Sequence, residues 1–114
     1  MLGDFNEDPD DKNVLLLESA GLTNLMMTMI DKKDISTYIY RGTNYLYDQI
    51  IVSNNILDEK GFILAGSTAY ILDLPKYRQQ KGKYKNYPFR FWAGNKLLGG
   101  YSDHLAVKAD FLTK

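Results

Sequence analysis

The sequence has no cysteine among its 114 residues, only one histidine, and no apolar run near the length of a membrane span. Without cysteine, neither a disulfide framework nor a thiolate metal site can form. A membrane-spanning helix needs about 20 consecutive apolar residues, so no such span is expected. Because 45% of the residues are hydrophobic and 13% are aromatic, the chain has enough core-forming side chains for one globular domain.

Two stretches of the chain each carry charge of one sign only, although the net charge of the whole chain is zero. Residues 1–11 carry five acids and no base, whereas residues 74–102 carry seven bases and no acid. An acidic cluster suits a cation and a basic stretch suits phosphate, but both patterns are also typical of solvated surface. The basic, aromatic run 76–92 (KYRQQKGKYKNYPFRFW) therefore indicates either a groove for phosphates and bases or an ordinary exposed loop. Arg90, within this run, is a candidate substrate contact.

The acidic start GDFNEDPDD has a partly structural explanation. Asp8 followed by Pro9 predicts an N-cap and a first helical residue. The two aspartates that follow would then lie in the first turn, where the helix dipole favours negative charge. We therefore expect a helix over residues 9–20, ended by a glycine. This interpretation accounts for three of the acids and leaves Asp4 and Asn6 unexplained.

The same acidic start offers a calcium-binding alternative. Asp4, Asn6 and Asp8 have the D-x-N-x-D spacing of the first three ligands of a calcium loop. The rest of that motif is not present. Pro9 stands where the sharp turn needs glycine, and Leu15 stands where the bidentate glutamate belongs.

The remaining chain alternates between predicted strands and loops. Stretches rich in β-branched and aromatic residues indicate strands, whereas polar, lysine-rich stretches indicate exposed loops. One apolar run, residues 62–72, cannot be assigned to helix or strand by periodicity. The other predictions are strands at 36–41 and 46–53 with a turn at 42–44, an exposed loop at 75–86, a short strand at 89–92 and a closing strand at 105–111. Together with the helix, these elements predict an α/β protein.

The chain contains three separated motifs, which are, in order, GDFN at 3–6, YDQIIVS at 47–53 and GYSDHLAV at 100–107. In this order the chain resembles the C-terminal half of the endonuclease/exonuclease/phosphatase family, the DNase I-like metal-dependent phosphodiesterases and phosphatases. The resemblance spans residues 1–111 and implies an α/β/β/α sandwich of two packed sheets. We expect this sequence to provide half of that sandwich, mostly one sheet with its helix layer.

The resemblance implies a role for each of five polar residues. Asp4 would orient or deprotonate the attacking water, and Asn6 would contact the phosphate. Asp103, together with Asp4, would lie at the metal, which is expected to be Mg²⁺ or Mn²⁺ because these ions prefer hard oxygen ligands. His104 would donate to a phosphoryl oxygen, and Asp48 would hold that histidine in its working tautomer.

A direct contact between Asp48 and His104 is expected on physical grounds as well. Asp48 lies between apolar residues of a predicted strand, where an unpaired carboxylate would be costly to bury. His104 is the natural partner, and the strands that carry the two residues are expected to lie side by side at one end of the sheet. The sequence departs from the family pattern at Gln49, where an aromatic residue is common, and at Leu105-Ala106-Val107, where the family commonly has a variable residue, proline and valine. Neither departure removes a charged group.

The resemblance further implies that residues 1–114 are the C-terminal part of a single domain whose N-terminal half, with the metal-binding glutamate, is absent. The expected function is metal-dependent hydrolysis of a phosphodiester or phosphomonoester by the complete domain, with a partial active site in this fragment. The isolated fragment is expected to be inactive and to form a homo-oligomer through an uncovered apolar sheet face. The alternative is a non-enzymatic interaction or structural module that retains remnants of the motifs. The substrate stays open among nucleic acid, nucleotide, phosphoinositide and sphingolipid head groups.

Overall fold

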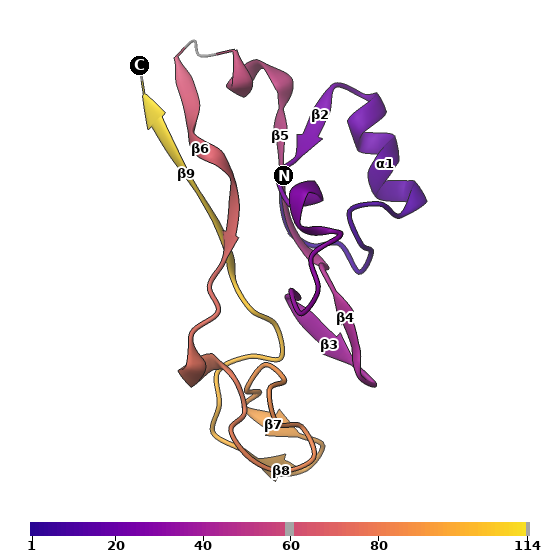
Figure 1. The fold of residues 1–114 in the computed structure, drawn as a ribbon, viewed down its shortest axis with the longest axis vertical. Helices are drawn as coiled ribbons and strands as arrows, with labels where there is room; N and C mark the ends of the chain where they lie inside the picture. Colours follow the sequence, from indigo (N-terminus) through magenta and orange to yellow (C-terminus); the bar gives the residue numbers. More distant parts are fainter. Residues whose placement is uncertain (59–60, 114) are drawn as a thin grey trace.

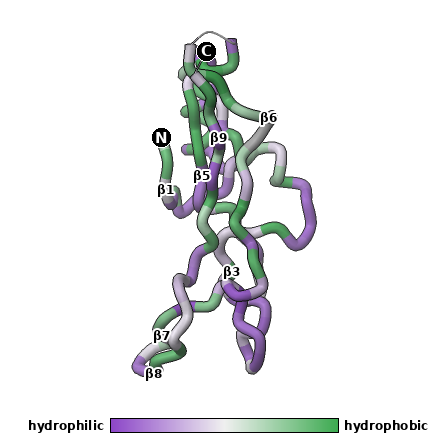
Figure 2. Tube along the Cα trace, turned by 90° about the vertical axis from the view of Figure 1, so that its left-hand side faces the viewer, coloured by the Kyte–Doolittle hydropathy of each residue, from purple (hydrophilic) through white to green (hydrophobic). Residues whose placement is uncertain are grey.

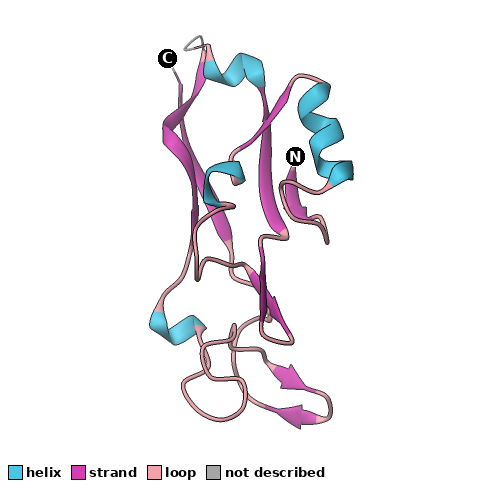
Figure 3. Cartoon of the chain, turned by 45° about the vertical axis from the view of Figure 1, so that its right-hand side comes forward, coloured by secondary structure: helices cyan, strands magenta, loops and turns pink. Residues whose placement is uncertain are grey.

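A computed structural model describes residues 1–58 and 61–113 and confirms the mixed α/β class. These residues form one α-helix, short 3-10 turns and four small sheets, an arrangement consistent with part of an α/β sandwich. The molecule is elongated, with extents of 49 × 30 × 24 Å. Its longest strands run along the long axis, and the helix lies to one side of them (Figures 1 and 3).

The central sheet is antiparallel and has the order β1-β5-β2, formed by Leu2–Asp4, Asp48–Ser53 and Leu22–Asn24. β5 is the middle strand, and its residues 49–52 are all buried, as its β-branched sequence predicts. The register pairs Asp4 with Asp48. The first and second of the three sequence motifs are therefore brought side by side by strand pairing.

A two-stranded antiparallel ribbon of β6, Phe62–Ile71, and β9, Val107–Thr113, lies beside β5 (Figure 1). The apolar run that periodicity left open is therefore a strand, and the predicted closing strand is confirmed. The core forms where this ribbon meets the central sheet, with Ile50 and Val52 packed near Phe111. The hydropathy view shows apolar residues following these strands, above two more polar hairpins (Figure 2).

The two hairpins lie at the end of the molecule away from the C-terminus (Figure 1). The first pairs β3 (Tyr38–Tyr40) with β4 (Thr43–Tyr45), and the second pairs β7 (Trp92–Ala93) with β8 (Lys96–Leu97). The predicted turn at 42–44 is right only at Gly42. Arg41 and Gly42 make the turn, with φ of 49° and 81°, whereas Thr43 and Asn44 belong to β4. Two positive φ values are typical of a type I′ hairpin turn. The predicted strand at 89–92 is confirmed only at its last residue.

The helix α1 spans Lys12–Ser19, so it begins three residues later and ends one residue earlier than predicted. The predicted N-cap, Asp8, is wrong because its Oδ1 accepts a hydrogen bond of 2.6 Å from the backbone N–H of Leu46. Asp11 is the N-cap instead, so Asp10 and Asp11 precede the helix and do not lie in its first turn.

The 3-10 turns are η1 Met27–Met29, η2 Asn54–Leu57 and η3 Pro75–Tyr77. No helix in residues 1–58 and 61–113 has the length and apolar character to cross a membrane.

An apolar groove runs along the edge of the central sheet where β1 and β5 face β9. Met1 and Leu2, at 58% and 70% exposure, line it together with Ile50, Val107 and Phe111. Self-association of the 114-residue chain stays a prediction, expected because exposed apolar surface of this kind favours burial against a second copy. Light scattering at micromolar concentration should give the mass of a dimer or larger species, and a stable monomer would contradict the prediction.

Candidate active site

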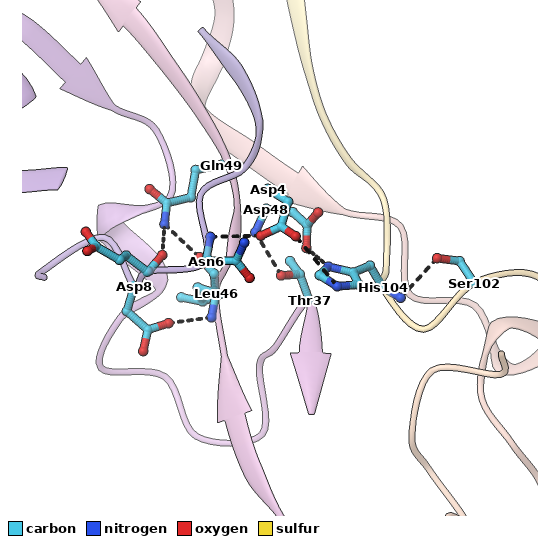
Figure 4. Close-up of polar contacts among 10 residues, drawn as sticks. Asp4, Asn6, Asp8, Thr37, Leu46, Asp48, Gln49, Ser102 and His104 are labelled. Atoms are coloured by element: carbon cyan, nitrogen blue, oxygen red, sulfur yellow. Dashed lines mark hydrogen bonds and ion pairs between the residues drawn. The ribbon is translucent and has the colours of Figure 1, made fainter. Parts of the chain in front are cut away.

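The predicted contact between Asp48 and His104 is confirmed. His104 Nδ1 lies 2.7 Å from Asp48 Oδ2, and the two side chains are only 23% and 17% exposed (Figure 4). Asp48 begins β5, whereas His104 lies in the loop before β9 and forms an isolated bridge with Tyr38 of β3. The two residues therefore meet through β3, and not through two adjacent strands of one sheet as expected.

Thr37 positions both Asp48 and His104, the pair called the dyad below, and the sequence did not reveal this role. Its backbone C=O accepts from Leu105 N–H at 2.8 Å, which draws the loop of His104 against the end of β3. Its Oγ1 accepts from Asp48 N–H at 3.1 Å, and the residue is fully buried. One side chain and its backbone thus fix both members of the pair. Ser102 Oγ adds an acceptor for the backbone N–H of His104 at 3.0 Å.

Asp4 approaches the same imidazole from its other nitrogen. Its Oδ2 lies 3.9 Å from His104 Nε2, a distance beyond a direct hydrogen bond. The other oxygen of Asp4 accepts from the backbone N–H of Asn6 at 2.9 Å, which makes an Asx-turn. Asn6 has a φ of 52°, a left-handed conformation that asparagine tolerates better than most residues. The turn therefore holds the Asp4 carboxylate beside the histidine.

Three other candidate residues stand apart from this contact. Asp103 and Asn6 are exposed, and neither side chain makes a hydrogen bond or ion pair with the described part of the chain. Arg90 lies in the loop that precedes β7, with its guanidinium over the ring of Tyr84. The structure therefore brings together Asp4, Asp48 and His104. The catalytic and metal-binding roles of all these residues stay predictions.

Aromatic and apolar side chains surround the histidine. Tyr38 stacks on the imidazole with a centroid distance of 4.6 Å and an interplanar angle of 21°. An apolar cavity of about 220 Å³ opens beside His104, with Leu72, Tyr77 and Tyr101 among its walls. The ring is thereby held on one face, and space for part of a ligand lies next to it.

Gln49, noted in the sequence only as a departure from the family pattern, proves to be a buried connector. Its Nε2 donates to the backbone C=O of Glu7 and of Leu46, and its Oε1 accepts from Asn24 Nδ2 at 2.7 Å. The side chain is fully buried. An amide can satisfy several backbone groups at once, which an aromatic ring cannot. Gln49 therefore ties the loop after Asp4 to β5.

Gly100, in the approach to Asp103 and His104, has no room for a side chain. A Cβ at this position would lie 2.1 Å from the backbone oxygen of Phe89. We predict that Gly100→Ala lowers the free energy of unfolding by on the order of 2 kcal/mol, because overpacking forces a backbone shift. Urea denaturation measures this change. An unaltered midpoint would show that the segment of Phe89 moves aside without cost.

The calcium alternative gains no support from the geometry. Asp8 and Asp10 line a cavity with Lys32 and Lys33, and Asp4 is not part of its wall. Across residues 1–58 and 61–113, no group of three or more His, Asp or Glu side chains is arranged to hold a metal ion. Asp8 serves a structural purpose through its bond to Leu46.

Asp8 also gives a pH-dependent prediction. Burial raises the pKa of its carboxyl group, the Leu46 N–H bond opposes this shift, and the nearby charges of Asp11 and Asp10 add to it. A raised folded-state pKa means that stability is greatest below the unfolded value and falls as pH rises through the folded pKa. Asp8→Asn keeps an acceptor for Leu46 and should raise stability at pH 7, by on the order of 0.5 kcal/mol because solvent screens the charge. Urea denaturation at pH 3.5 and 7 measures the effect of Asp8→Asn on the free energy of unfolding. An increase at pH 3.5 as large as that at pH 7 would contradict the prediction.

The comparisons with known proteins agree with the motifs. The model of the Endonuclease/Exonuclease/phosphatase family matches residues 1–112. Comparisons with curated proteins and with solved structures gave no match. The family match covers nearly the whole chain and includes the three residues that meet at the imidazole. The chain therefore belongs to the endonuclease/exonuclease/phosphatase family.

Proposed function

We propose that this chain takes part in metal-dependent hydrolysis of a phosphodiester or phosphomonoester, as the C-terminal part of one endonuclease/exonuclease/phosphatase domain. The family is generally hydrolytic, and its members commonly use divalent metals. The proposal rests mainly on the contacts of the His104 imidazole. Its Nδ1 is hydrogen-bonded to Asp48, and its Nε2 faces Asp4. This arrangement gives one donor with a fixed direction beside a carboxylate that can accept a proton.

In this proposal His104 acts from Nε2. A hydrogen bond from Nδ1–H to Asp48 fixes the orientation of the ring. The protonated Nε2 can then donate to a phosphoryl oxygen, on which negative charge grows as water attacks. The distance of 3.9 Å to Asp4 leaves Nε2 without a direct hydrogen bond to that carboxylate, so it can meet a substrate oxygen.

Asp4 is proposed to orient the attacking water and to take its proton. One of its oxygens is engaged by Asn6 N–H in the Asx-turn, and the other faces the imidazole. Because the turn fixes the carboxylate, the lone pair that meets the water has a defined direction. The exposed amide of Asn6 is proposed to contact the phosphate.

The proposed metal is Mg²⁺ or Mn²⁺, with Asp103 and Asp4 as its ligands in this segment. Carboxylate oxygens fit such hard cations, which are often bound through one or two carboxylates together with water and substrate oxygens. When bound, the ion polarises a phosphoryl oxygen. We propose that residues of the domain outside the 114 supply a further ligand, so the 114-residue chain alone should hold the ion weakly.

A hydrolysis assay tests the proposal. The gene product that contains these residues is incubated with bis(p-nitrophenyl) phosphate or p-nitrophenyl phosphate, in Mg²⁺ or in EDTA. Release of p-nitrophenolate that needs Mg²⁺ is expected, and the 114-residue chain alone should stay at background. A complete domain without metal-dependent hydrolysis of phosphate esters would contradict the proposal and favour a non-enzymatic interaction module.

A further inference from the structure

A second cavity, of about 600 Å³, lies between the β3–β4 hairpin and the loop of residues 83–90. Its volume is within the range of ligand sites. Three cationic side chains line it, Arg41, Lys83 and Arg90, and no acidic residue belongs to its wall. We call it the basic cavity. The sequence indicated Arg90 as a candidate substrate contact, and the proposed function uses none of the three cations.

The three cations are held by aromatic rings. Arg41 lies 5.1 Å from the centre of the Tyr40 ring, and Lys83 and Arg90 lie 5.5 and 5.6 Å from that of Tyr84. None of the three has an acidic partner within ion-pair distance among the residues that the structure describes. A ring positions a cation without cancelling its charge. The guanidinium and ammonium donors therefore remain able to bind an anion.

Contacts distant in sequence fix the two walls of the basic cavity to each other. The backbone N–H of Gly42, in the hairpin turn, donates to the hydroxyl of Tyr87 at 2.7 Å. The loop itself is anchored by the bridge between Arg78 and Pro88 and by the ion pair of Arg78 with Asp73. The basic cavity is therefore formed by tertiary contacts between the hairpin and the loop.

A row of rings connects the basic cavity to the dyad. Tyr38 stacks on His104 at 4.6 Å, and Tyr40 lies nearly parallel to Tyr38 at 6.5 Å, with an interplanar angle of 11°. Both tyrosines line the basic cavity, and Tyr40 is 50% exposed. A substrate with one phosphate at His104 can therefore continue over these rings to the three cations.

We propose that the basic cavity binds a single-stranded segment of nucleic acid that extends from the phosphate held at His104. The inference rests on the proposed function and names its substrate class. A strand presents phosphates at regular intervals for Arg41, Lys83 and Arg90, and a base that stacks on the exposed ring of Tyr40. A phosphoinositide head group would use the cations, but it has no planar group for the tyrosine.

Binding is measured separately from hydrolysis. Fluorescence anisotropy follows a labelled 12-residue oligo(dT) on the 114-residue chain in EDTA, at several salt concentrations. The double variant Arg41→Gln/Arg90→Gln should weaken binding and reduce the slope of log K against log salt by about 1.4, since each single-strand phosphate contact contributes about 0.7. Tyr40→Ala should weaken binding about 5-fold or more, and Tyr40→Trp should preserve it.

The matched control is Lys12→Gln/Lys33→Gln, which removes the same charge from outside the basic cavity. An equal loss of slope in this control would overturn the inference, because binding would then follow net charge alone. Displacement of oligo(dT) by vesicles with 5% phosphatidylinositol bisphosphate, at lower concentration than by unlabelled oligo(dT), would overturn the nucleic-acid assignment. Cavity-dependent binding without phosphate-ester hydrolysis by the complete domain would refute the proposed function and leave the basic cavity a nucleic-acid site.

Discussion

Replacing His104 by alanine in the complete domain is expected to lower the rate of phosphate-ester hydrolysis by on the order of 10²-fold or more. The variant removes the donor at Nε2 and leaves Asp48, its partner at 2.7 Å, without the imidazole. Because this donor acts on charge that develops in the transition state, the loss should appear mainly in kcat. Steady-state kinetics with bis(p-nitrophenyl) phosphate in Mg²⁺ measures it.

Two comparisons separate chemistry from folding in this experiment. Lys96→Ala, at an exposed position in β8, is the control and should leave the rate unchanged. Added imidazole should restore part of the activity of His104→Ala, since it can occupy the space beside Tyr38 and Asp48. A rate equal to that of the unmodified domain would remove His104 from the mechanism.

Replacing Gln49 by leucine is expected to lower the free energy of unfolding by roughly 3 kcal/mol. The variant has similar volume but leaves the C=O groups of Glu7 and Leu46 and the amide of Asn24 without their buried partner. Each unsatisfied buried group costs about 1–3 kcal/mol. The loop after Asp4, which Gln49 holds through Glu7, should also loosen, so activity should fall together with stability.

The control for this variant is Gln80→Leu, the same chemical change at an exposed position. Gln80 donates to the C=O groups of Pro75 and Arg78, but water can replace these bonds. Urea denaturation should therefore show a much smaller shift, below about 1 kcal/mol. Equal losses of unfolding free energy in the two variants would mean that burial does not make the hydrogen bonds of Gln49 more important for stability.

The parts of the fold that the sequence predicted are those in which local pattern and burial agree. The strand that became β5 has a run of β-branched residues, and all of residues 49–52 are buried. The contact of Asp48 with His104 was predictable because a half-buried carboxylate needs a partner and the chain offers one histidine. Order of the motifs along the chain then placed both at one site.

The sequence was misleading where a side chain has a distant partner. Asp8 before Pro9 is a good local helix start, but its carboxylate is bound by Leu46, 38 residues away. The helix consequently begins at Lys12. The turn of the first hairpin was misplaced because Arg41, an unusual residue at positive φ, takes its first position.

Thr37 and the basic cavity were beyond sequence reasoning for a related reason. Thr37 joins β3 to Asp48 and to the loop of His104 through one hydroxyl and one backbone carbonyl, which no local pattern reveals. The basic cavity joins Arg41 to residues more than 40 positions away. Only the cations of the loop could be suspected from the sequence, as part of the acid-free stretch.

In the proposed mechanism, Asp48 holds the imidazole through Nδ1–H and leaves Nε2 for the substrate. His104 is the only histidine, so its ring signals in a nitrogen–proton NMR spectrum need no assignment. At a pH where the ring is neutral, we expect the tautomer with its proton on Nδ1, and loss of that preference in Asp48→Ala. A proton on Nε2, unchanged in Asp48→Ala, would remove this role of Asp48.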